Sequence, residues 1–239
     1  MNYLLVFICI IVGYLFGSIP TGYLYAKYKG INILEFGSKN PGSTNIGRAL
    51  GKNASHTVFL MDLFKVIIPI VLLNVIYMIL NKHNFNIHLY MDANYLSNVE
   101  LDILNSKLIT IWTGMGAVLG HSYPIFLHFI GGKGISCTMA TMLCISPIYA
   151  VILFMIYKIT TKLTKYVSMG SITALTVLLL SSILLSISHI YPYDFYKSNL
   201  LLPAIIIIYV LCIYRHKDNI IRLINKTESK ISIDNGTEI

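Results

Sequence analysis

The sequence predicts an all-α, polytopic membrane protein with about seven transmembrane helices, two of them short, and three observations lead to this prediction. Of the 239 residues, 56% are hydrophobic and only 12% are charged, whereas soluble domains carry about 25% charged residues. The apolar residues form runs close to the roughly 20 residues that cross a bilayer. The cations lie in short segments between these runs. A soluble globular domain is thereby excluded, and we expect one integral-membrane domain over 1–239 with a solvated tail at 229–239.

The expected helices follow the apolar runs, which lie at about 3–27, 57–80, 104–120, 134–165, 167–190 and 200–214. The run at 134–165 is too long for a single crossing and short for two. Pro147 lies near its middle and biases the preceding residue, Ser146, away from helical conformation. We therefore expect two short, tilted helices that meet at a tight turn around 144–147. With one crossing for each of the other runs, the chain crosses seven times.

The charges of the loops predict the orientation, because cytoplasmic loops of membrane proteins hold an excess of Lys and Arg. With the N-terminus outside and the C-terminus inside, 15 of the 18 Lys and Arg residues fall on inner segments, and the outer segments keep Lys82, Lys107 and Lys197. A single helix across 134–165 would move the lysine cluster at 158–165 to the outer side. The asymmetry therefore favours seven crossings.

The formal net charge of +8 indicates an anionic partner. Nucleic acid is disfavoured, because the cations do not gather on one soluble face. Anionic membrane lipid or a phosphate-bearing substrate agrees better with cations placed at the membrane boundary.

The first inner loop, from Gly37 to Arg48, has the composition of an anion cradle. Three glycines, two serines, a threonine and two asparagines provide backbone N–H groups and polar side chains that can wrap an anion. Ser38 and Asn45 belong to this set, and Arg48 can bind a phosphate through a bidentate fork. A flexible linker is the alternative interpretation, although ordinary connections are shorter.

A second inner loop contains a lysine among three glycines: Gly131, Gly132, Lys133 and Gly134. This sequence lets an ammonium group and several N–H groups approach one phosphate at the start of the helix that begins near Ile135. It is not a Walker A loop, because the required Gly and Ser/Thr are missing from their places. A simple turn with a snorkelling lysine is the alternative.

Two further inner segments carry candidate polar residues. Ser168 stands at a helix start, where its hydroxyl can serve a site or cap the helix. His216 and Asn219 are three residues apart and share one face if the segment is helical. Ordinary basic anchoring after the last span is the alternative for that segment. Within the second apolar run, Asp62 and Lys65 are expected to pair, because an isolated charge inside a membrane is unfavourable.

In this order and spacing, the four inner segments resemble the acyl-phosphate-dependent glycerol-3-phosphate acyltransferase family of bacterial integral-membrane enzymes. The similarity runs through most of the chain and includes the segment 17–24. The resemblance implies seven transmembrane helices and a multi-pass enzyme in the bacterial inner membrane, with its active site facing the cytoplasm. It also implies transfer of an acyl group from long-chain acyl phosphate to the sn-1 hydroxyl of glycerol 3-phosphate, giving lysophosphatidate and phosphate.

The resemblance also implies roles for individual residues. It places phosphate binding on Ser38, Arg48 and Lys133, and the further catalytic roles on Ser168, His216 and Asn219. We group the neighbouring loop residues with the phosphate-binding set; they are Asn45, Gly131, Gly132 and Gly134. No cofactor, metal or nucleic acid is expected. The chain departs from the family pattern at Lys39, where glycine is usual, and this change adds a charge.

The residue types agree with this reaction. Two phosphate-bearing substrates bring about four negative charges into one pocket, and inner-loop cations can offset them. An acyl phosphate has a good leaving group, so positioning and electrostatic stabilisation can suffice. The base is left open between His216 and a substrate phosphate, and the resemblance implies the latter. The acyl tail is expected between helices, reached from the inner leaflet.

Two other function classes compete. A small transporter or flippase for an organic phosphate would use the same cations, with helix breaks at Pro20, Pro69, Pro147 and Pro203. Against it, the sequence has no inverted repeat. A metal-dependent phosphate-transferring enzyme is disfavoured, because the inner loops have few carboxylates to hold Mg²⁺.

Overall fold

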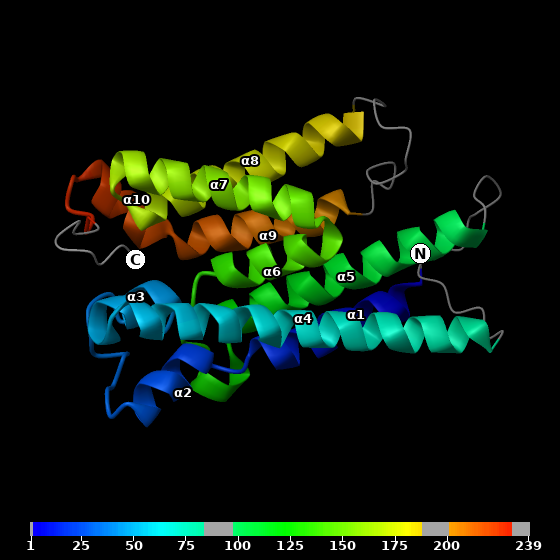
Figure 1. Cartoon of the computed structure of the whole chain (residues 1–239), viewed down its shortest axis with the longest axis horizontal. Coiled ribbons are helices and arrows are strands. Elements are labelled where there is room, and N and C mark those ends of the chain that lie inside the picture. The colour runs from blue at the N-terminus through cyan, green and yellow to red at the C-terminus, as the bar shows by residue number, and fades with distance from the viewer. Residues whose placement is uncertain (1, 84–97, 188–200, 231–239) are drawn as a thin grey trace.

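The computed structural model describes residues 2–83, 98–187 and 201–230, and these residues form an α-helical bundle without strands. The all-α prediction is therefore confirmed for the described part of the chain. The long helices run side by side along the longest axis of the molecule (Figure 1). The helices are α1 (Tyr3–Gly17), α2 (Thr21–Tyr28), α3 (Ser43–Leu50), α4 (Lys52–Lys82), α5 (Asn98–Ser122), α6 (Ile135–Ile145), α7 (Pro147–Thr164), α8 (Val167–Ile187), α9 (Leu202–Arg215) and α10 (Lys217–Ile224).

Several of these helices are suited to a membrane. Among the described residues, four helical segments are long and apolar enough to cross one: Tyr3–Tyr28, Lys52–Lys82, Pro147–Thr164 and Val167–Ile187. Helices α6 and α9 are shorter and also apolar. Large apolar side chains point outward along the bundle, as an exposure of 66% for Leu184 illustrates. Outward apolar faces are unfavourable in water and favourable in lipid, so the chain is a multi-pass membrane protein.

The structure confirms the split of the run at 134–165. Helix α6 ends at Ile145 and α7 begins at Pro147. Between them Ser146 is extended, with φ −153° and ψ 100°. Proline is well suited to the first turn of a helix, because the N–H group that it lacks would have no partner there.

The first apolar run differs from the expectation, because it contains a break that separates α1 from α2. Pro20 precedes α2 and lacks the N–H group that a continuous helix would need. The break leaves the carbonyl oxygen of Ile19 free to accept a hydrogen bond from Lys65 Nζ at 3.0 Å. It also begins α2 at Thr21, whose hydroxyl donates to Asp62 at 2.6 Å. The interruption thus supplies polar partners inside the bundle.

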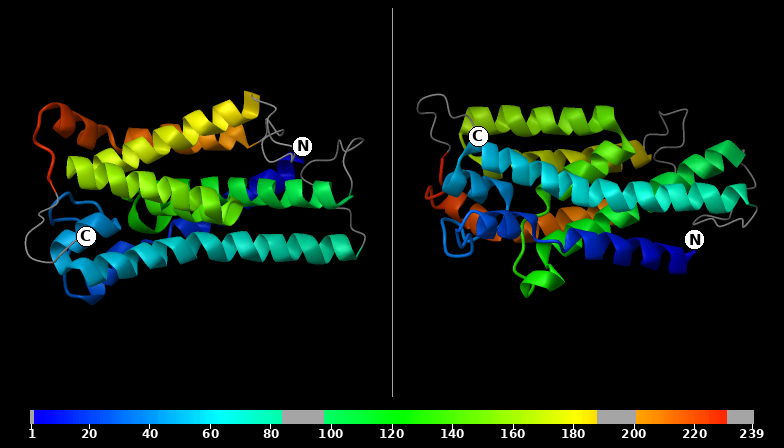
Figure 2. Two further views of the ribbon diagram at one scale, coloured as in Figure 1. Left: turned by 45° about the horizontal axis from the view of Figure 1, so that its top comes forward. Right: turned by 60° about the horizontal axis from the view of Figure 1, so that its bottom comes forward.

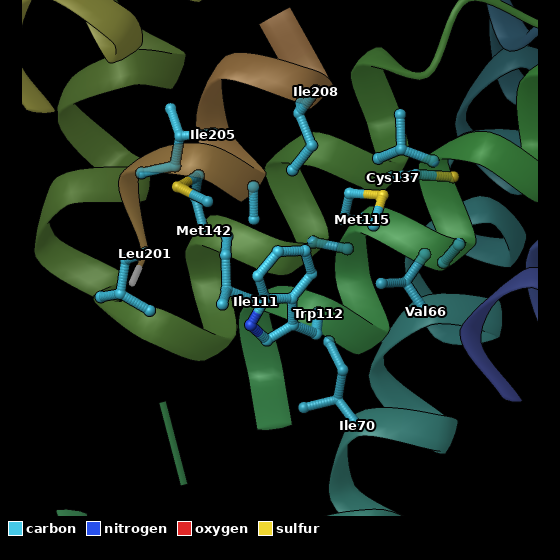
Figure 3. Packing of buried hydrophobic residues seen from close by; sticks show 14 of the residues in the cluster. Val66, Ile70, Ile111, Trp112, Met115, Cys137, Met142, Leu201, Ile205 and Ile208 are labelled. Carbon is cyan, nitrogen blue, oxygen red and sulfur yellow. The ribbon is translucent and has the colours of Figure 1, made fainter. Parts of the chain in front are cut away.

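Helix α5 lies at the centre of the core. Figure 3 shows Trp112 and Met115 of α5 between Val66 of α4, Cys137 of α6 and Ile208 of α9, all of them buried. On its other side α5 packs against α1 so closely that a Cβ atom at Gly13 would collide with the backbone of Thr113. Small residues permit such close helix contacts in membrane proteins. At the end of α5, a Cβ atom at Gly120 would likewise collide with the carbonyl oxygen of Tyr14, so the loop after α5 starts from a fixed point.

Two short helices, α3 and α10, lie at one end of the bundle, opposite the N-terminus (Figure 1). The two further views keep both helices at that end, beside the turn from α7 to α8 (Figure 2). The glycine-rich loop expected at 37–48 is therefore partly helical. The tail expected at 229–239 lies outside the described residues except for its first two, which are exposed.

Candidate active site

A cavity of about 150 Å³ opens at the end of the bundle that carries α3 and α10. Segments far apart in the sequence meet around it, from the loop before α3 to the residues after α10. Three of the residues that were expected to act together, Arg48, Lys133 and His216, share its wall. In all, the predicted site residues that line it are Ser38, Asn45, Arg48, Lys133, Ser168, His216 and Asn219.

Helix α3 presents Arg48 to the cavity. Gly42 is extended and precedes the helix, and its N–H group donates to Asn40 Oδ1 at 2.8 Å, which fixes the entry of the chain. Asn45 is 2% exposed. Its side chain accepts from the Ser38 N–H group at 3.1 Å and donates to the Phe36 carbonyl oxygen at 2.9 Å. Asn45 therefore holds the preceding loop against α3.

Lys133 projects from the loop before α6. Burial, together with the positive charges of the nearby arginines, lowers the pKa of its ammonium group to about 8, against the attraction of Glu228. An anion placed beside Lys133 raises this pKa again, because an opposite charge favours the ionised form. A lowered pKa of this kind is expected of a lysine that binds a negatively charged ligand.

The three glycines around Lys133 shape the loop and do not line the cavity. Arg215 donates to the carbonyl oxygens of Gly131 at 2.6 Å and Gly132 at 3.0 Å, so this arginine stabilises the conformation of the loop. A Cβ atom at Gly132 would collide with the imidazole ring of His121. Gly134 has φ +84°, a conformation that glycine adopts readily. The three glycines thus contact neighbouring protein groups and do not face the cavity.

Glu228 also lines the cavity, and it was not among the site residues predicted from the sequence. Its Oε1 accepts hydrogen bonds from Ser168 Oγ at 2.9 Å and Asn219 Nδ2 at 2.7 Å, and its Oε2 accepts from Arg222 Nε at 2.7 Å. Burial raises the pKa of Glu228, but the hydrogen bonds from Arg222, Asn219 and Ser168 outweigh it, so the pKa lies below its ordinary value. The carboxylate thus fixes two predicted site residues.

His216 lies at the turn between α9 and α10 and is buried. Its Nδ1 is 2.7 Å from the carbonyl oxygen of Cys212, and because a carbonyl only accepts, Nδ1 carries the proton. Burial and the repulsion of Lys133 lower the pKa of His216 to about 4. The imidazole is therefore neutral at pH 7, with Nε2 as its remaining acceptor.

The expected pairing of Asp62 with Lys65 is confirmed, at 2.9 Å between Nζ and Oδ1. The same carboxylate oxygen lies 3.5 Å from His121 Nδ1 and accepts from Thr21, so the pair belongs to a larger buried network. Asp62 and His121 also line the cavity. The pair was predictable from the sequence, but its extension to Thr21 and His121 was not.

The charges around the cavity do not cancel. The two carboxylates among its described lining residues are both paired with cations, Asp62 with Lys65 and Glu228 with Arg222. By contrast, Arg48 and Lys133 have no carboxylate partner within the described part of the chain. Two uncompensated cations favour an anionic ligand. The remaining wall is largely apolar and comes from α4, α6, α7 and α8; it includes Phe59, Ile135, Met139, Phe154, Tyr157, Val167 and Ala174.

Comparisons with known proteins agree with this chemistry. A family model described as glycerol-3-phosphate acyltransferase matches residues 7–226. A glycerol-3-phosphate acyltransferase of Acholeplasma laidlawii is 37% identical, over 97% of this chain and 95% of the relative. A protein of the same name from Fusobacterium nucleatum is 33% identical, over 94% of this chain and 97% of the relative.

The fold also matches solved structures. The crystal structure of an integral membrane glycerol 3-phosphate acyltransferase in its glycerol 3-phosphate form has a TM-score of 0.73 and 31% identity, over 95% of this chain and 96% of that one. The lysophosphatidic acid form gives a TM-score of 0.71 at the same identity, over 95% of each chain.

Proposed function

The chain belongs to the glycerol-3-phosphate acyltransferase family, and from this premise we propose that it transfers a fatty acyl group from acyl phosphate to the sn-1 hydroxyl of glycerol 3-phosphate. The products are lysophosphatidate and phosphate. One observation carries the proposal: a single cavity joins Arg48 and Lys133, which have no carboxylate partner among the described residues, to an apolar wall. An enzyme that joins a phosphate-bearing alcohol to a fatty acyl chain needs both.

The cations hold the phosphate groups of the two substrates. Each phosphate brings about −1.5 to −2 charges at pH 7, so the substrates repel each other until Arg48 and Lys133 offset part of that charge. The guanidinium of Arg48 provides a bidentate fork, and Lys133 a point charge. Ser38 lies beside them in the cavity wall and adds a hydroxyl. The glycine loop around Lys133, braced by Arg215, keeps the ammonium group in place.

Ser168 and Asn219 orient the glycerol hydroxyls. Both side chains donate to Glu228, so Ser168 Oγ and Asn219 Oδ1 present acceptor sites to the cavity. A hydroxyl group donates its proton readily to such acceptors. The buried carboxylate therefore sets these two residues to receive an alcohol, and a correctly placed sn-1 oxygen needs little further reorganisation to react.

The reaction needs no protein nucleophile. The sn-1 oxygen attacks the carbonyl carbon of the acyl phosphate, a carbon–oxygen ester bond forms, and the bond to the phosphate oxygen breaks. The hydroxyl proton must go to a base. A phosphate with its second pKa near about 6 is a better acceptor than His216, whose pKa of about 4 is low because of burial and Lys133. We therefore assign the proton to a substrate phosphate, and His216 to orientation of the substrate.

The acyl chain lies along the apolar wall between α4, α6, α7 and α8. Residues such as Phe154 and Met139 line this side of the cavity. These helices carry exposed apolar faces, so a lipid-borne acyl phosphate can enter from the membrane without passing through water.

We further propose seven crossings, made by α1 with α2 as one span and by each helix from α4 to α9. The N-terminus is outside, the C-terminus is inside, and the site faces the cytoplasm of a bacterial inner membrane. The distribution of Lys and Arg supports this orientation, and the four candidate loops share one end of the bundle (Figure 1).

A reconstituted assay tests the function. The purified chain in detergent is incubated with labelled acyl phosphate and glycerol 3-phosphate, with and without EDTA. We expect lysophosphatidate in both reactions, without coenzyme A or acyl carrier protein. Loss of product with EDTA would instead favour a metal-dependent enzyme. Absence of product, together with uptake of an organic phosphate by proteoliposomes, would favour a transporter.

A further inference from the structure

A second cavity, of about 280 Å³, lies beside the proposed reaction site. It is formed by the loop before α3, the loop around Lys133 and the turn between α9 and α10. Its wall shares four residues with the cavity of about 150 Å³ described above, which we call the inner cavity: Ser38, Asn40, Lys133 and Asn219. Because these residues line both spaces, a ligand in the outer cavity is adjacent to the groups that bind substrate phosphate. We call this space the outer cavity.

The outer cavity is strongly cationic. Five basic side chains line it, and Asp218 is the single carboxylate among its described lining residues. Two of the five cations are already occupied. Arg215 donates to two loop carbonyl oxygens and lies 5.1 Å from the ring centre of Tyr123, while Arg222 donates to Glu228. Their hydrogen bonds hold the wall and are not free to follow a ligand.

Lys133 is shared with the reaction site, so Lys39 and Lys217 are the two available cations that belong to the outer cavity alone. Both are exposed, and neither has a carboxylate partner in the described part of the chain. Lys217 Nζ lies 4.8 Å from the ring centre of Tyr214, which is itself part of the wall. An aromatic face steadies the ammonium group without neutralising it. The outer cavity therefore has an uncancelled positive potential.

Lys39 occupies a backbone position that does not suit it. Its φ is +56°, in the left-handed region that disfavours residues with a Cβ atom. Its N–H group donates to the Phe36 carbonyl oxygen at 2.9 Å, which holds the turn in this conformation. The turn would be less strained with glycine. The feature that lysine adds at this position is a positive charge at the edge of the outer cavity.

We propose that the outer cavity is a collection site for the phosphate group of glycerol 3-phosphate, in which Lys39 and Lys217 hold the incoming dianion before Lys133 and Arg48 take it into the reaction site. This inference rests on the proposed function. A cleft lined by charges of one sign raises the local concentration of a substrate of opposite sign and speeds its capture. Phosphate released by the reaction and the headgroup of an anionic lipid share the same chemistry, so the experiment separates these sources.

The test compares the full-length enzyme with the double variant Lys39→Gly, Lys217→Gln. The glycine suits the positive φ, so the variant should fold. The matched control is Lys52→Gln, Lys162→Gln. Lys52 begins α4, directly after α3, and Lys162 lies in the last turn of α7; neither residue lines the outer cavity. Thermal unfolding of all three proteins is recorded first. Steady-state rates are then measured in detergent with saturating acyl phosphate and varied glycerol 3-phosphate, at ionic strengths of about 20 and 200 mM, which change the screening length severalfold.

At low ionic strength we expect the KM for glycerol 3-phosphate to rise about fivefold in the double variant, with kcat changed by less than about twofold, because electrostatic collection acts before the chemical step. The difference should shrink at high ionic strength, and the control should follow the wild type. An unchanged KM with an unchanged salt dependence would overturn the proposal. A fall in kcat at constant KM would also overturn it, because the lysines would then act in the reaction itself.

Two further arms identify the ligand. An effect of the variant that appears only in nanodiscs with anionic lipid, and not in detergent or phosphatidylcholine, would assign the outer cavity to lipid headgroups. A loss of product inhibition by inorganic phosphate, with the KM for glycerol 3-phosphate unchanged, would assign it to the departing phosphate. Either result would overturn our assignment.

A binding measurement separates this inference from the proposed function. Glycerol 3-phosphate is titrated calorimetrically into each protein without acyl phosphate, and we expect about fivefold weaker binding by the double variant only. If the wild type binds glycerol 3-phosphate in this way but forms no lysophosphatidate, the proposed function fails and the collection site stands. If product forms but neither binding nor KM responds to the substitutions, the collection site alone is wrong.

Discussion

Replacement of Glu228 by glutamine tests whether one buried carboxylate organises the catalytic wall. The carboxylate accepts hydrogen bonds from Ser168 and Asn219 on one oxygen and from Arg222 on the other, at 2.7 to 2.9 Å. Glutamine keeps the shape but has one oxygen and one NH₂ group. Whichever way the amide is turned, its NH₂ group faces a donor that had been satisfied. The variant therefore loses at least one charge-assisted hydrogen bond and gains an unfavourable donor–donor contact.

The magnitude follows from these contacts. A hydrogen bond to a charged group contributes about 1.5–3 kcal/mol, and an unsatisfied buried donor costs about 1–3 kcal/mol. Because Arg222 is partly exposed and water can compensate it, we expect the free energy of unfolding to fall by about 3 kcal/mol. For a chain of this size, that change lowers Tm by about 6–12 °C. The rate should fall at least about tenfold, because Ser168 and Asn219 lose the partner that orients them.

The assay is thermal unfolding in detergent, followed by intrinsic fluorescence, together with turnover at saturating substrates. The matched control is Glu35→Gln, which removes an exposed carboxylate that accepts a surface hydrogen bond from Asn32 and should change stability by less than about 0.5 kcal/mol. A Glu228→Gln protein as stable and active as the Glu35→Gln protein would refute the reasoning.

Three further perturbations test other parts of the site. Because the pKa of Lys133 is lowered to about 8, we expect kcat/KM for glycerol 3-phosphate to fall above pH 8 as the ammonium group loses its proton. The variant Lys133→Arg should abolish this fall in kcat/KM at alkaline pH. A fall that persists in the variant would contradict the assignment. Gly132→Ala forces a methyl group against the ring of His121, so stability should drop by about 1–3 kcal/mol and activity with it; unfolding curves that superimpose on the wild type would argue against this packing. Asp62→Asn leaves Lys65 unpaired and should destabilise the protein by about 3–5 kcal/mol, measured as a lower Tm. Joint replacement by Asp62→Leu and Lys65→Met should recover part of the loss, and no recovery would mean that the pair is not the source.

Some of the fold was predictable because single residues dictate local geometry. Pro147 cannot continue a helix from Ser146, so the division of the run at 134–165 followed directly from the sequence. The pairing of Asp62 with Lys65 followed from their spacing and from the penalty for an unpaired charge in a membrane. The candidate loops could be grouped because cations and glycines recur in the same segments.

Other features depend on contacts that the sequence does not record. Glu228 stands in a basic, polar segment, and only folding brings it to Ser168, which is 60 residues away. The side chain of Asn45 could bind a ligand, yet its amide group makes hydrogen bonds to the backbone of the preceding loop. The break before Thr21 lies inside an apolar run. It can be explained only by the contacts that it makes with Asp62 and Lys65 of α4. Tertiary pairing thus decided the details that pattern and composition left open.

In the proposed reaction, Arg48 and Lys133 together neutralise the phosphates of two reactants in one cavity. The most direct measurement is turnover of acyl phosphate and glycerol 3-phosphate to lysophosphatidate by the Arg48→Gln, Lys133→Gln protein, with both substrates saturating and with its Tm recorded. Since removal of one electrostatic partner of a transition state lowers a rate by about 100- to 1000-fold, we predict that turnover falls by at least that factor while Tm is retained. Near wild-type turnover by a folded double variant would contradict the account.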